Sequence, residues 1–383
     1  MHIESVRTKG FRNLSDLEFS PNQGLNVFIG KNGQGKTNLL ETIYVAGKGK
    51  SFRAGKFNEL RNQNLNLNPQ DVCGLKFKVK DQNISHEIQI TWTETSKQTL
   101  LDGKKVTTAK LIQILPIILF SPESLSSIKD GPEKRRDLID EMLTSSFEQQ
   151  HLYHQFKKAL TNRNRFLRDC KENQNFEETL YNSLNVLYTN FSTKLAQARI
   201  NYLLNLEPFV KKALSLIFDD ELNYKFEYFI SDRKVKDWDV KQILDLHLER
   251  AEQLKVAEYR SGTSLVGAHK HDIKFFINDN DSRYFSSQGQ QRGLILALKM
   301  AEVLYKFKKG EKPILLLDDV LSELDHEKRE RLLTFLKSFK TQIFITTTEL
   351  FEEKKLEGHY FKVKEGSVFG DLEENLQRGN LNV

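Results

Sequence analysis

The chain has 383 residues, and 58 Lys and Arg against 52 Asp and Glu give a formal net charge of +6. This length exceeds one small module and predicts two domains, or one large domain with an insertion. A hydrophobic content of 38% supplies a core, while only 7 Pro and 20 Gly exclude collagen-like and long disordered stretches.

Cysteine content and hydropathy exclude further classes. Cys73 and Cys170 are too few for a disulfide framework or a four-ligand zinc site. The N-terminus lacks the apolar core of a secretory signal. The most apolar window, 111–120, contains Pro116 and is far shorter than the roughly 20 residues that cross a bilayer. We therefore expect a cytoplasmic protein.

The first 120 residues favour strands, with one helix after a glycine-rich turn. Apolar and polar residues alternate with period two in most of this part. The expected strands cover 3–7, 17–19, 24–29, 73–79, 84–92 and 117–120, with a helix over 38–45 and a short hairpin whose tip is Asp102-Gly103.

Residues 121–260 have apolar side chains at spacings of three and four, which predicts long helices. A β-like stretch, 224–230, interrupts them. Strand-rich and helix-rich material alternates from 261 to 383, where 313–317 and 342–346 have the continuous apolar character of buried parallel strands. We therefore divide the chain into 1–120, 121–260 and 261–383.

A glycine-rich motif follows the strand expected at 24–29. The run Gly30-Lys31-Asn32-Gly33-Gln34-Gly35-Lys36-Thr37 fits G-x-x-x-x-G-K-[ST]. Triphosphate oxygens need backbone N–H donors at a helix N-terminus, and glycines allow that close approach. We predict that ATP binds here, with Lys36 on the β- and γ-phosphates and Thr37 on Mg²⁺. The alternative is a glycine-rich turn with a chance lysine, but it does not explain why the predicted strand, loop and helix all match the P-loop pattern.

Two carboxylates follow the apolar strand expected at 313–317. A P-loop enzyme needs an acid at such a strand end to hold Mg²⁺, and Asp318 takes that role. Asp319 is placed to orient the attacking water, so the predicted catalytic residues are Lys36, Asp318 and Asp319. The P-loop and this acid lie at opposite ends of the chain. The helical middle must therefore be an insertion, across which the two end segments fold together.

The run Phe285-Ser286-Ser287-Gln288-Gly289-Gln290-Gln291-Arg292 precedes a predicted helix and resembles the signature motif of ABC-type ATPases. A Ser hydroxyl and N–H groups at a helix N-terminus suit a phosphate. The alternative is an ordinary capped helix start, but the order of P-loop, this motif and Asp318 favours the signature. Leu321-Ser322-Glu323-Leu324-Asp325 resembles the D-loop of the same superfamily.

Within that superfamily the chain resembles the RecF family of bacterial recombination and replication-repair ATPases, which are related to SMC heads. The similarity follows the same order along nearly the whole chain. Besides the P-loop, it is carried by Gly10-Phe11-Arg12-Asn13-Leu14, Lys50-Ser51-Phe52-Arg53, Phe120-Ser121-Pro122-Glu123, Gly131-Pro132 with Arg135, Arg136 and Asp140, Ser287–Arg292, and Leu317–Asp325.

The resemblance implies an α/β fold: an ABC-type P-loop ATPase head with a mixed sheet and an inserted α-helical lobe. It implies a homodimer around two ATP that binds duplex and single-stranded DNA or gaps, hydrolyses ATP slowly under DNA stimulation, and assists recombinase loading with RecR and RecO near the bacterial nucleoid. Carried over by position, the residues beyond the P-loop that bind nucleotide would be Arg12, Asn13, Arg53, Ser287, Gly289, Gln290 and Asp325.

Some positions depart from the superfamily pattern. Thr346-Thr347-Thr348 stands where transporter ATPases have a switch histidine, and Ser121 follows Phe120 where a Q-loop glutamine would be sought. Asp319 is one methylene shorter than the usual catalytic Glu. These departures predict slow hydrolysis, with ATP acting chiefly as a dimerisation switch. Gly267-Ala268-His269-Lys270-His271-Asp272 also differs from the Gly-Pro-His-Arg-Asp-Asp of RecF-like chains.

One predicted helical stretch, 157–168, concentrates five cations, and the first acid after it is Asp169. Such a face could neutralise DNA phosphates without reading sequence. An ordinary solvated helix face is the alternative. The candidate DNA contacts are Lys157, Lys158, Arg163, Arg165 and Arg168.

Two other function classes fit the sequence less well. The nucleotide-binding subunit of an ABC transporter would need the switch histidine and the Q-loop glutamine. A structural clamp of the SMC type would need heptads over hundreds of residues, and the insertion is too short for them.

Overall fold

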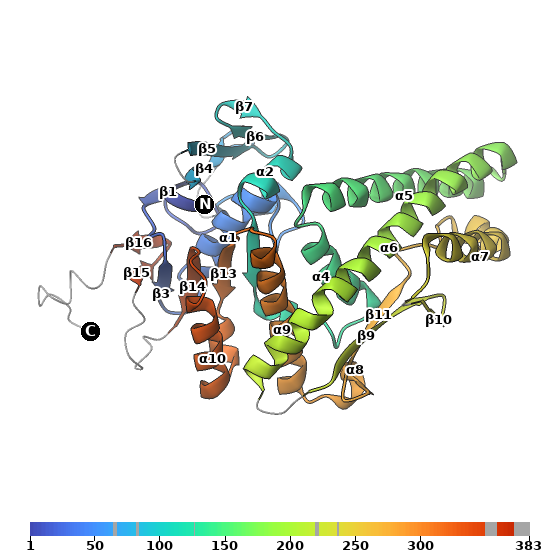
Figure 1. Ribbon diagram of the computed structural model, residues 1–383. Coiled ribbons are helices and arrows are strands. Elements are labelled where there is room, and N and C mark those ends of the chain that lie inside the picture. The colour runs from blue at the N-terminus through green and yellow to red at the C-terminus, as the bar shows by residue number, and fades with distance from the viewer. Residues whose placement is uncertain are drawn as a thin grey trace, which may run out of the picture. The chain divides into compact units, whose positions relative to one another are not determined.

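A computed structural model describes residues 1–63, 67–81, 84–125, 127–218, 222–235, 237–348 and 358–370. The chain divides into two compact units (Figure 1). Unit 1 comprises Met1–Pro122 together with Lys306–Val383, and unit 2 comprises Glu123–Tyr305. The two ends of the chain therefore fold together, as the separation of the P-loop from Asp318 predicts.

Unit 1 contains two six-stranded sheets. The antiparallel sheet has the order β2-β1-β4-β5-β6-β7, and the mixed sheet has the order β16-β15-β3-β14-β13-β8. The antiparallel strands are β1 (His2–Lys9), β2 (Leu17–Phe19), β4 (Cys73–Asp81), β5 (Ile84–Trp92), β6 (Lys97–Leu101) and β7 (Lys104–Lys105). The mixed sheet holds β3 (Leu25–Ile29), β8 (Ile117–Phe120), β13 (Ile314–Asp318), β14 (Ile343–Thr347), β15 (His359–Lys364) and β16 (Ser367–Phe369).

Helix α1 (Lys36–Lys48) lies between these two sheets. Every residue of α1 except Thr37 and Asn38 is buried. Its apolar side chains share one core with residues of both sheets, among them Phe77 of β4 and Phe344 of β14. A helix with apolar side chains on several faces needs neighbours on each of those faces, and the two sheets provide them. The remaining helices of unit 1 are α2 (Thr108–Ile114), α10 (His326–Lys337) and two 3₁₀ turns, Phe57–Leu60 and Val320–Glu323.

Unit 2 combines long helices with a small antiparallel sheet of order β10-β9-β11-β12. Its elements are α4 (Pro132–Leu143), α5 (Phe147–Asn173), α6 (Glu178–Ile217), β9 (Tyr224–Ile230), β10 (Arg233–Lys234), α7 (Val240–Ser261), β11 (Asp272–Ile277), β12 (Asn280–Asp281) and α8 (Ser282–Phe285). Two helices cross a unit boundary: α3 (Pro122–Leu125) and α9 (Gln288–Lys308).

The division differs from the predicted boundary after residue 260. Strand β11 pairs with β9 over its whole length, from Asp272 opposite Phe229 to Ile277 opposite Tyr224. This pairing joins residues on either side of α7 into one sheet, so 261–305 fold with the helical part. The pattern of the sequence indicates the strand at 224–230, but it does not indicate that β11 pairs with it across α7.

Most individual elements agree with the sequence predictions. The strands, the hairpin at Asp102-Gly103 and the long helices are present, although α1 begins two residues earlier than expected. The hairpin β15–β16 was not predicted. Residues 82 and 83, between the strands expected at 73–79 and 84–92, lie outside the described residues.

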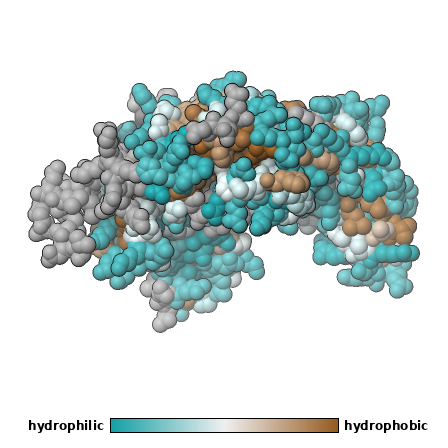
Figure 2. Space-filling model, turned by 90° about the horizontal axis from the view of Figure 1, so that it is seen from below, coloured by the Kyte–Doolittle hydropathy of each residue, from teal (hydrophilic) through white to brown (hydrophobic). Residues whose placement is uncertain are grey.

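The surface of unit 2 carries some exposed apolar side chains. Figure 2 shows apolar colour gathering at the end where Figure 1 places α5 to α7. Val186 and Leu187 of α6 and Val240 and Val256 of α7 are exposed. Within the described residues, no helix has the length and apolar character to cross a membrane.

Candidate nucleotide-binding site

The P-loop lies between β3 and α1, as the motif predicts. Gly33 and Gly35 have φ of +79° and +108°, values that favour glycine. A side chain at Gly35 would also press against Leu14 and Asn13, since its Cβ would lie 3.0 and 3.1 Å from their atoms. The loop backbone can therefore curl at the N-terminus of α1, where N–H groups are available to an anion.

Lys36 is folded back onto this loop. Its Nζ donates to the carbonyl oxygens of Gly30 at 2.6 Å and Lys31 at 3.0 Å. Burial lowers the pKa of Lys36, and the charges of Asp319 and Asp318 oppose that effect. The ammonium is therefore held inside the loop that it would share with the phosphates.

Asp318 ends β13 beside the P-loop. Strands β3, β14 and β13 are parallel neighbours, so their carboxyl ends meet at one edge of the sheet. The Thr37 hydroxyl donates to Asp318 Oδ1 at 2.9 Å. The structure thus brings together the two residues that the sequence assigns to Mg²⁺ across 281 positions of the chain.

Thr346 at the end of β14 completes this edge. Its hydroxyl donates to Asp318 Oδ1 at 2.9 Å and accepts from the backbone N–H of Asp319 at 2.9 Å. Asp319 has φ +50°, an uncommon conformation for a residue with a side chain. The threonine in the place of a switch histidine therefore contacts the Asp318 carboxylate and the Asp319 backbone.

The β15–β16 turn braces the P-loop, a contact that no motif indicates. The backbone N–H of Glu365 donates to Gln34 Oε1 at 2.7 Å, and that of Gly366 donates to the Gln34 carbonyl at 2.9 Å. Gly366 has no room for a side chain, because a Cβ there would lie 2.0 Å from the Asn13 carbonyl oxygen. A hairpin at the end of the described chain thus supports the loop near its beginning.

A buried carboxylate, Glu41, gathers two of the predicted nucleotide residues. Arg12 donates to it through Nε and Nη2, both at 3.0 Å, and Arg53 donates through Nη2 at 2.7 Å. The Ser51 hydroxyl also donates to it. The resemblance placed Arg12 and Arg53 near the nucleotide but did not identify Glu41, which has no motif of its own.

Asn13 contacts the P-loop directly. Its Nδ2 donates to the Gly33 carbonyl at 3.1 Å, and its Oδ1 accepts from Asn38 at 2.5 Å. Asn38 in turn accepts from Arg53. A continuous chain of hydrogen bonds therefore connects Arg53 with the phosphate-binding loop.

The residues at this edge fit Mg²⁺ and a nucleotide. The Thr37 hydroxyl and the Asp318 carboxylate are hard oxygen donors, the kind that Mg²⁺ prefers, and they already lie within hydrogen-bond distance. The loop presents Lys31, Asn32 and Gly33 to solvent, so a phosphate chain can approach. These residues could hold the ion and the triphosphate.

The signature-like motif lies in unit 2, at the start of α9. The Gln290 backbone N–H donates to Ser287 Oγ at 3.2 Å, and the Ser287 N–H donates to Gln290 Oε1 at 2.9 Å, which makes a reciprocal capping box. Ser287 and Gly289 are exposed. Just before them, Tyr284 and Phe285 are 66% and 72% exposed. Asp325 of the D-loop-like run caps α10, accepting from the Lys328 N–H at 3.0 Å.

The cationic stretch on α5 requires a correction at Arg163. This side chain is fully buried and pairs with Glu258, so it is unavailable to DNA. It lies on the face of α5 that packs against α6 and α7, among apolar residues such as Phe156 and Phe166. The other four candidates are exposed, namely Lys157, Lys158, Arg165 and Arg168.

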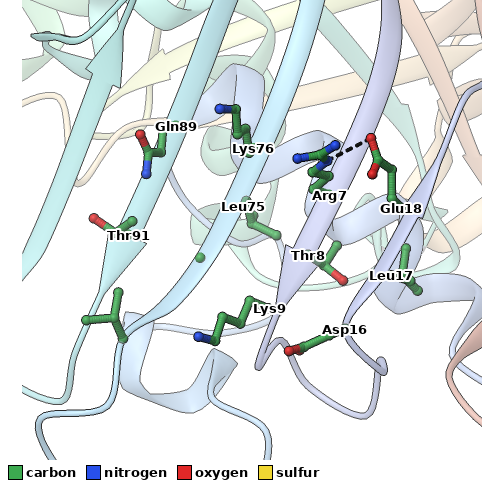
Figure 3. A pocket seen from close by; sticks show the side chains of 12 residues that line it. Arg7, Thr8, Lys9, Asp16, Leu17, Glu18, Leu75, Lys76, Gln89 and Thr91 are labelled. Atoms are coloured by element: carbon green, nitrogen blue, oxygen red, sulfur yellow. Dashed lines mark ion pairs between the residues drawn. The ribbon is translucent and has the colours of Figure 1, made fainter.

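A groove of about 660 Å³ lies apart from the P-loop, on the outer face of the antiparallel sheet (Figure 3). Two of its cations are already paired: Arg7 with Glu18 at 2.7 Å and Lys76 with Glu87 at 2.8 Å. None of its lining residues belongs to the P-loop or to β13. The groove is therefore distinct from the candidate nucleotide site.

Comparisons with known proteins agree with this geometry. Residues 2–359 match the model of the RecF/RecN/SMC N-terminal domain. The chain is 34% identical over 375 residues to the DNA replication and repair protein RecF of Thermoanaerobacter sp. (strain X514), covering 96% of this chain and 99% of that protein.

Two solved structures bear on the fold. One is the recombination mediator protein RecF with ATPrS, from the RecFOR pathway, with a TM-score of 0.85, 30% identity, and 97% and 98% of the two chains covered. The other is an Smc head bound to the C-winged helix domain of ScpA, with a TM-score of 0.57, 14% identity, and 98% and 100% covered. The second supports the ATPase-head fold alone.

Proposed function

Because this chain belongs to the RecF family of the RecF/RecN/SMC group, we propose that it is a DNA replication and repair ATPase in which ATP drives formation of a homodimer that binds DNA. The observation that carries the proposal is the meeting of Thr37 with Asp318 at 2.9 Å, beside Lys36. These residues come from opposite ends of the chain and make up the two halves of a P-loop ATPase site.

In this proposal Lys36 leaves the Gly30 and Lys31 carbonyls and binds the β- and γ-phosphates of ATP. Thr37 and Asp318 hold Mg²⁺, which supplies neutralisation of the developing phosphate charge. Asp319 orients water. The short side chain of Asp319 and the threonine at position 346 support slow hydrolysis, which DNA would stimulate.

In this proposal, Ser287 of a second subunit completes the nucleotide site. In the free chain its hydroxyl caps α9, and it lies on an exposed helix start that suits a phosphate. The neighbouring Tyr284 and Phe285 are large aromatic side chains left in solvent, as is typical of residues that anchor an interface. Both features support closure of the site by another copy of the chain.

DNA would meet the exposed cations of α5, which can bind phosphates without reading sequence. The relatives' place in the RecFOR pathway supports mediators similar to RecR and RecO as partners, with recombinase loading at gaps as the outcome. Duplex, single-stranded and gapped substrates are the forms to compare.

Sedimentation of the full chain with and without ATP and DNA tests the proposal. We expect a monomer alone and a dimer with ATP. Lys36→Ala should weaken ATP binding by about 100-fold, because it removes a charged donor to the phosphates, and should abolish the dimer. Asp319→Asn should bind ATP normally and give a long-lived dimer. A wild-type chain that stays monomeric under every condition would refute the proposal.

A further inference from the structure

Glu41 lies one helical turn beyond the phosphate-binding end of α1. It is the fourth residue after Thr37, and a rise of about 1.5 Å per residue places it about 6 Å farther along the helix axis, on the same face. Its carboxylate is fully buried. The groups that donate to it come from two loops, one after β1 and one after α1.

The charges of this cluster do not balance. Two guanidinium groups, those of Arg12 and Arg53, share one carboxylate, which leaves one positive charge over. The arginine side chains are 24% and 31% exposed, whereas the carboxylate has no exposure. Burial raises the pKa of Glu41, but hydrogen bonds from Arg12, Ser51 and Arg53 outweigh it and hold the pKa below its ordinary value. The carboxylate is therefore ionised at neutral pH.

We propose that Glu41 is a positioning residue that holds Arg12 and Arg53 side by side at the rim of the P-loop, where their exposed edges bind the phosphate chain of ATP. The inference rests on the proposed function, since it needs ATP at the P-loop. The arginines supply the direct contacts, and Glu41 acts through them.

Fixing these side chains in advance has a clear benefit. A free arginine loses about 2 kcal/mol of rotamer entropy when it is immobilised. Glu41 makes that loss part of folding, so binding does not incur it again. The chain of contacts from Arg53 through Asn38 to Asn13 and the Gly33 carbonyl keeps the arginine in register with the loop.

A purely structural ion pair looks different in this molecule. In unit 2, Arg163 and Glu258 are both fully buried, and neither presents an edge to a ligand. Glu258→Gln is therefore a matched control for Glu41→Gln, because each substitution removes the charge of a buried carboxylate that arginine holds.

The test measures the Kd for ATP by titration calorimetry, the kcat for hydrolysis, and thermal unfolding of the full chain. We expect Glu41→Gln to raise the Kd by about tenfold, the size of one charge-assisted hydrogen bond, and to change kcat by less than about twofold. Glu258→Gln should lower the unfolding temperature and leave the Kd unchanged. A Kd for Glu41→Gln within about twofold of wild type would overturn the inference.

Arg53→Gln keeps the test decisive if Glu41→Gln does not fold. Because Arg53 is partly exposed, this variant should fold, raise the Kd to a similar extent, and combine non-additively with Glu41→Gln. An unchanged Kd for Arg53→Gln would again overturn the inference. The wild-type and Lys36→Ala titrations separate the two proposals: a wild-type chain without ATP binding refutes the function itself, whereas normal binding in both the Glu41 and Arg53 variants refutes only this role.

Discussion

Each unit of this chain buries a glutamate against arginine, and the two clusters differ in how far the arginine reaches solvent. In unit 1, Arg12 and Arg53 surround Glu41 with side chains 24% and 31% exposed. In unit 2, Arg163 and Glu258 show no exposure at all. Burial of the carboxylate alone therefore does not separate a functional cluster from a structural one.

The accessibility of the cation makes the distinction. Arg163 donates to Glu258, Ser264, Tyr181 and Asn185, all within unit 2. It lies in the middle of a helix, while Arg12 and Arg53 lie on loops, where binding groups are commonly found. A cation that is fully enclosed in the fold holds elements together, and one with an exposed edge is available to a ligand.

The largest effect expected from this comparison is on unit 2. Arg163→Ala leaves Glu258 buried without its partner, which should lower the free energy of unfolding by about 3–5 kcal/mol. Chemical denaturation measures this loss. The double replacement Arg163→Met with Glu258→Leu should restore much of the stability, because it removes both charges.

ATP affinity of the folded Arg163→Ala protein should be unchanged. If Arg163→Ala lowers the free energy of unfolding by less than about 1 kcal/mol, the Arg163 cluster is solvated, and its contrast with the Glu41 cluster disappears. If the Arg163→Ala variant is fully folded and still has a raised Kd for ATP, Arg163 belongs to the nucleotide site.

The burial of Arg163 was accessible from the sequence. It follows Phe156 by seven residues and precedes Phe166 by three, so helical periodicity puts it on the apolar face of α5. A count of the cations in the stretch ignores that periodicity, and the prediction that Arg163 contacts DNA is wrong. Lys157 and Arg165 lie on the opposite face and are exposed.

The role of Glu41 was not accessible in the same way. Its partners lie 29 and 12 positions away, and nothing in their spacing indicates a shared carboxylate. The P-loop could be read because its chemistry is encoded within eight adjacent residues. The pairing of β11 with β9 and the bracing turn at Gly366 depend on long-range contacts, which local patterns do not specify.

A smaller expected effect is a pH dependence of stability that comes from two buried histidines of unit 2. In unit 2, His247 Nε2 and His271 Nε2 lie 3.0 Å apart, while their Nδ1 atoms contact Thr193 and Tyr228. Burial lowers the pKa of His247 to about 4 and that of His271 well below its ordinary value, with Arg199 and Arg136 adding to the second effect. Both rings are therefore neutral in the folded protein at pH 7.

The direction of this pH dependence follows from the difference in proton binding between the folded and unfolded chains. The unfolded chain binds protons at an ordinary histidine pKa of about 6.5, and the folded chain does not, so stability is present above that pH and is lost as the pH falls toward 4. The free energy of unfolding that is lost between pH 7 and pH 5 should be about 2 kcal/mol smaller in His247→Gln than in the wild type. Denaturation curves at the two pH values measure it. Equal losses in variant and wild type would mean that His247 is protonated in the fold.

The smallest expected effect concerns the exposed face of α5, where Arg163 has no part. Changing Lys157, Arg165 and Arg168 together to Gln should weaken DNA binding by about tenfold. The slope of log K against log salt concentration should become shallower by up to about 0.9 for each lost phosphate contact. Stability should stay within about 0.5 kcal/mol, because surface changes cost little. DNA affinity measured across a salt series supplies both quantities.

Lys104, Lys105 and Lys110 of unit 1 give a matched control, since they are exposed and their replacement removes the same charge. If both triple variants lose affinity equally, net charge alone attracts DNA and α5 is no site. If only the α5 variant changes the salt slope, its cations contact phosphates. Arg163→Ala completes the comparison, because a buried cation should lower stability and leave the slope intact.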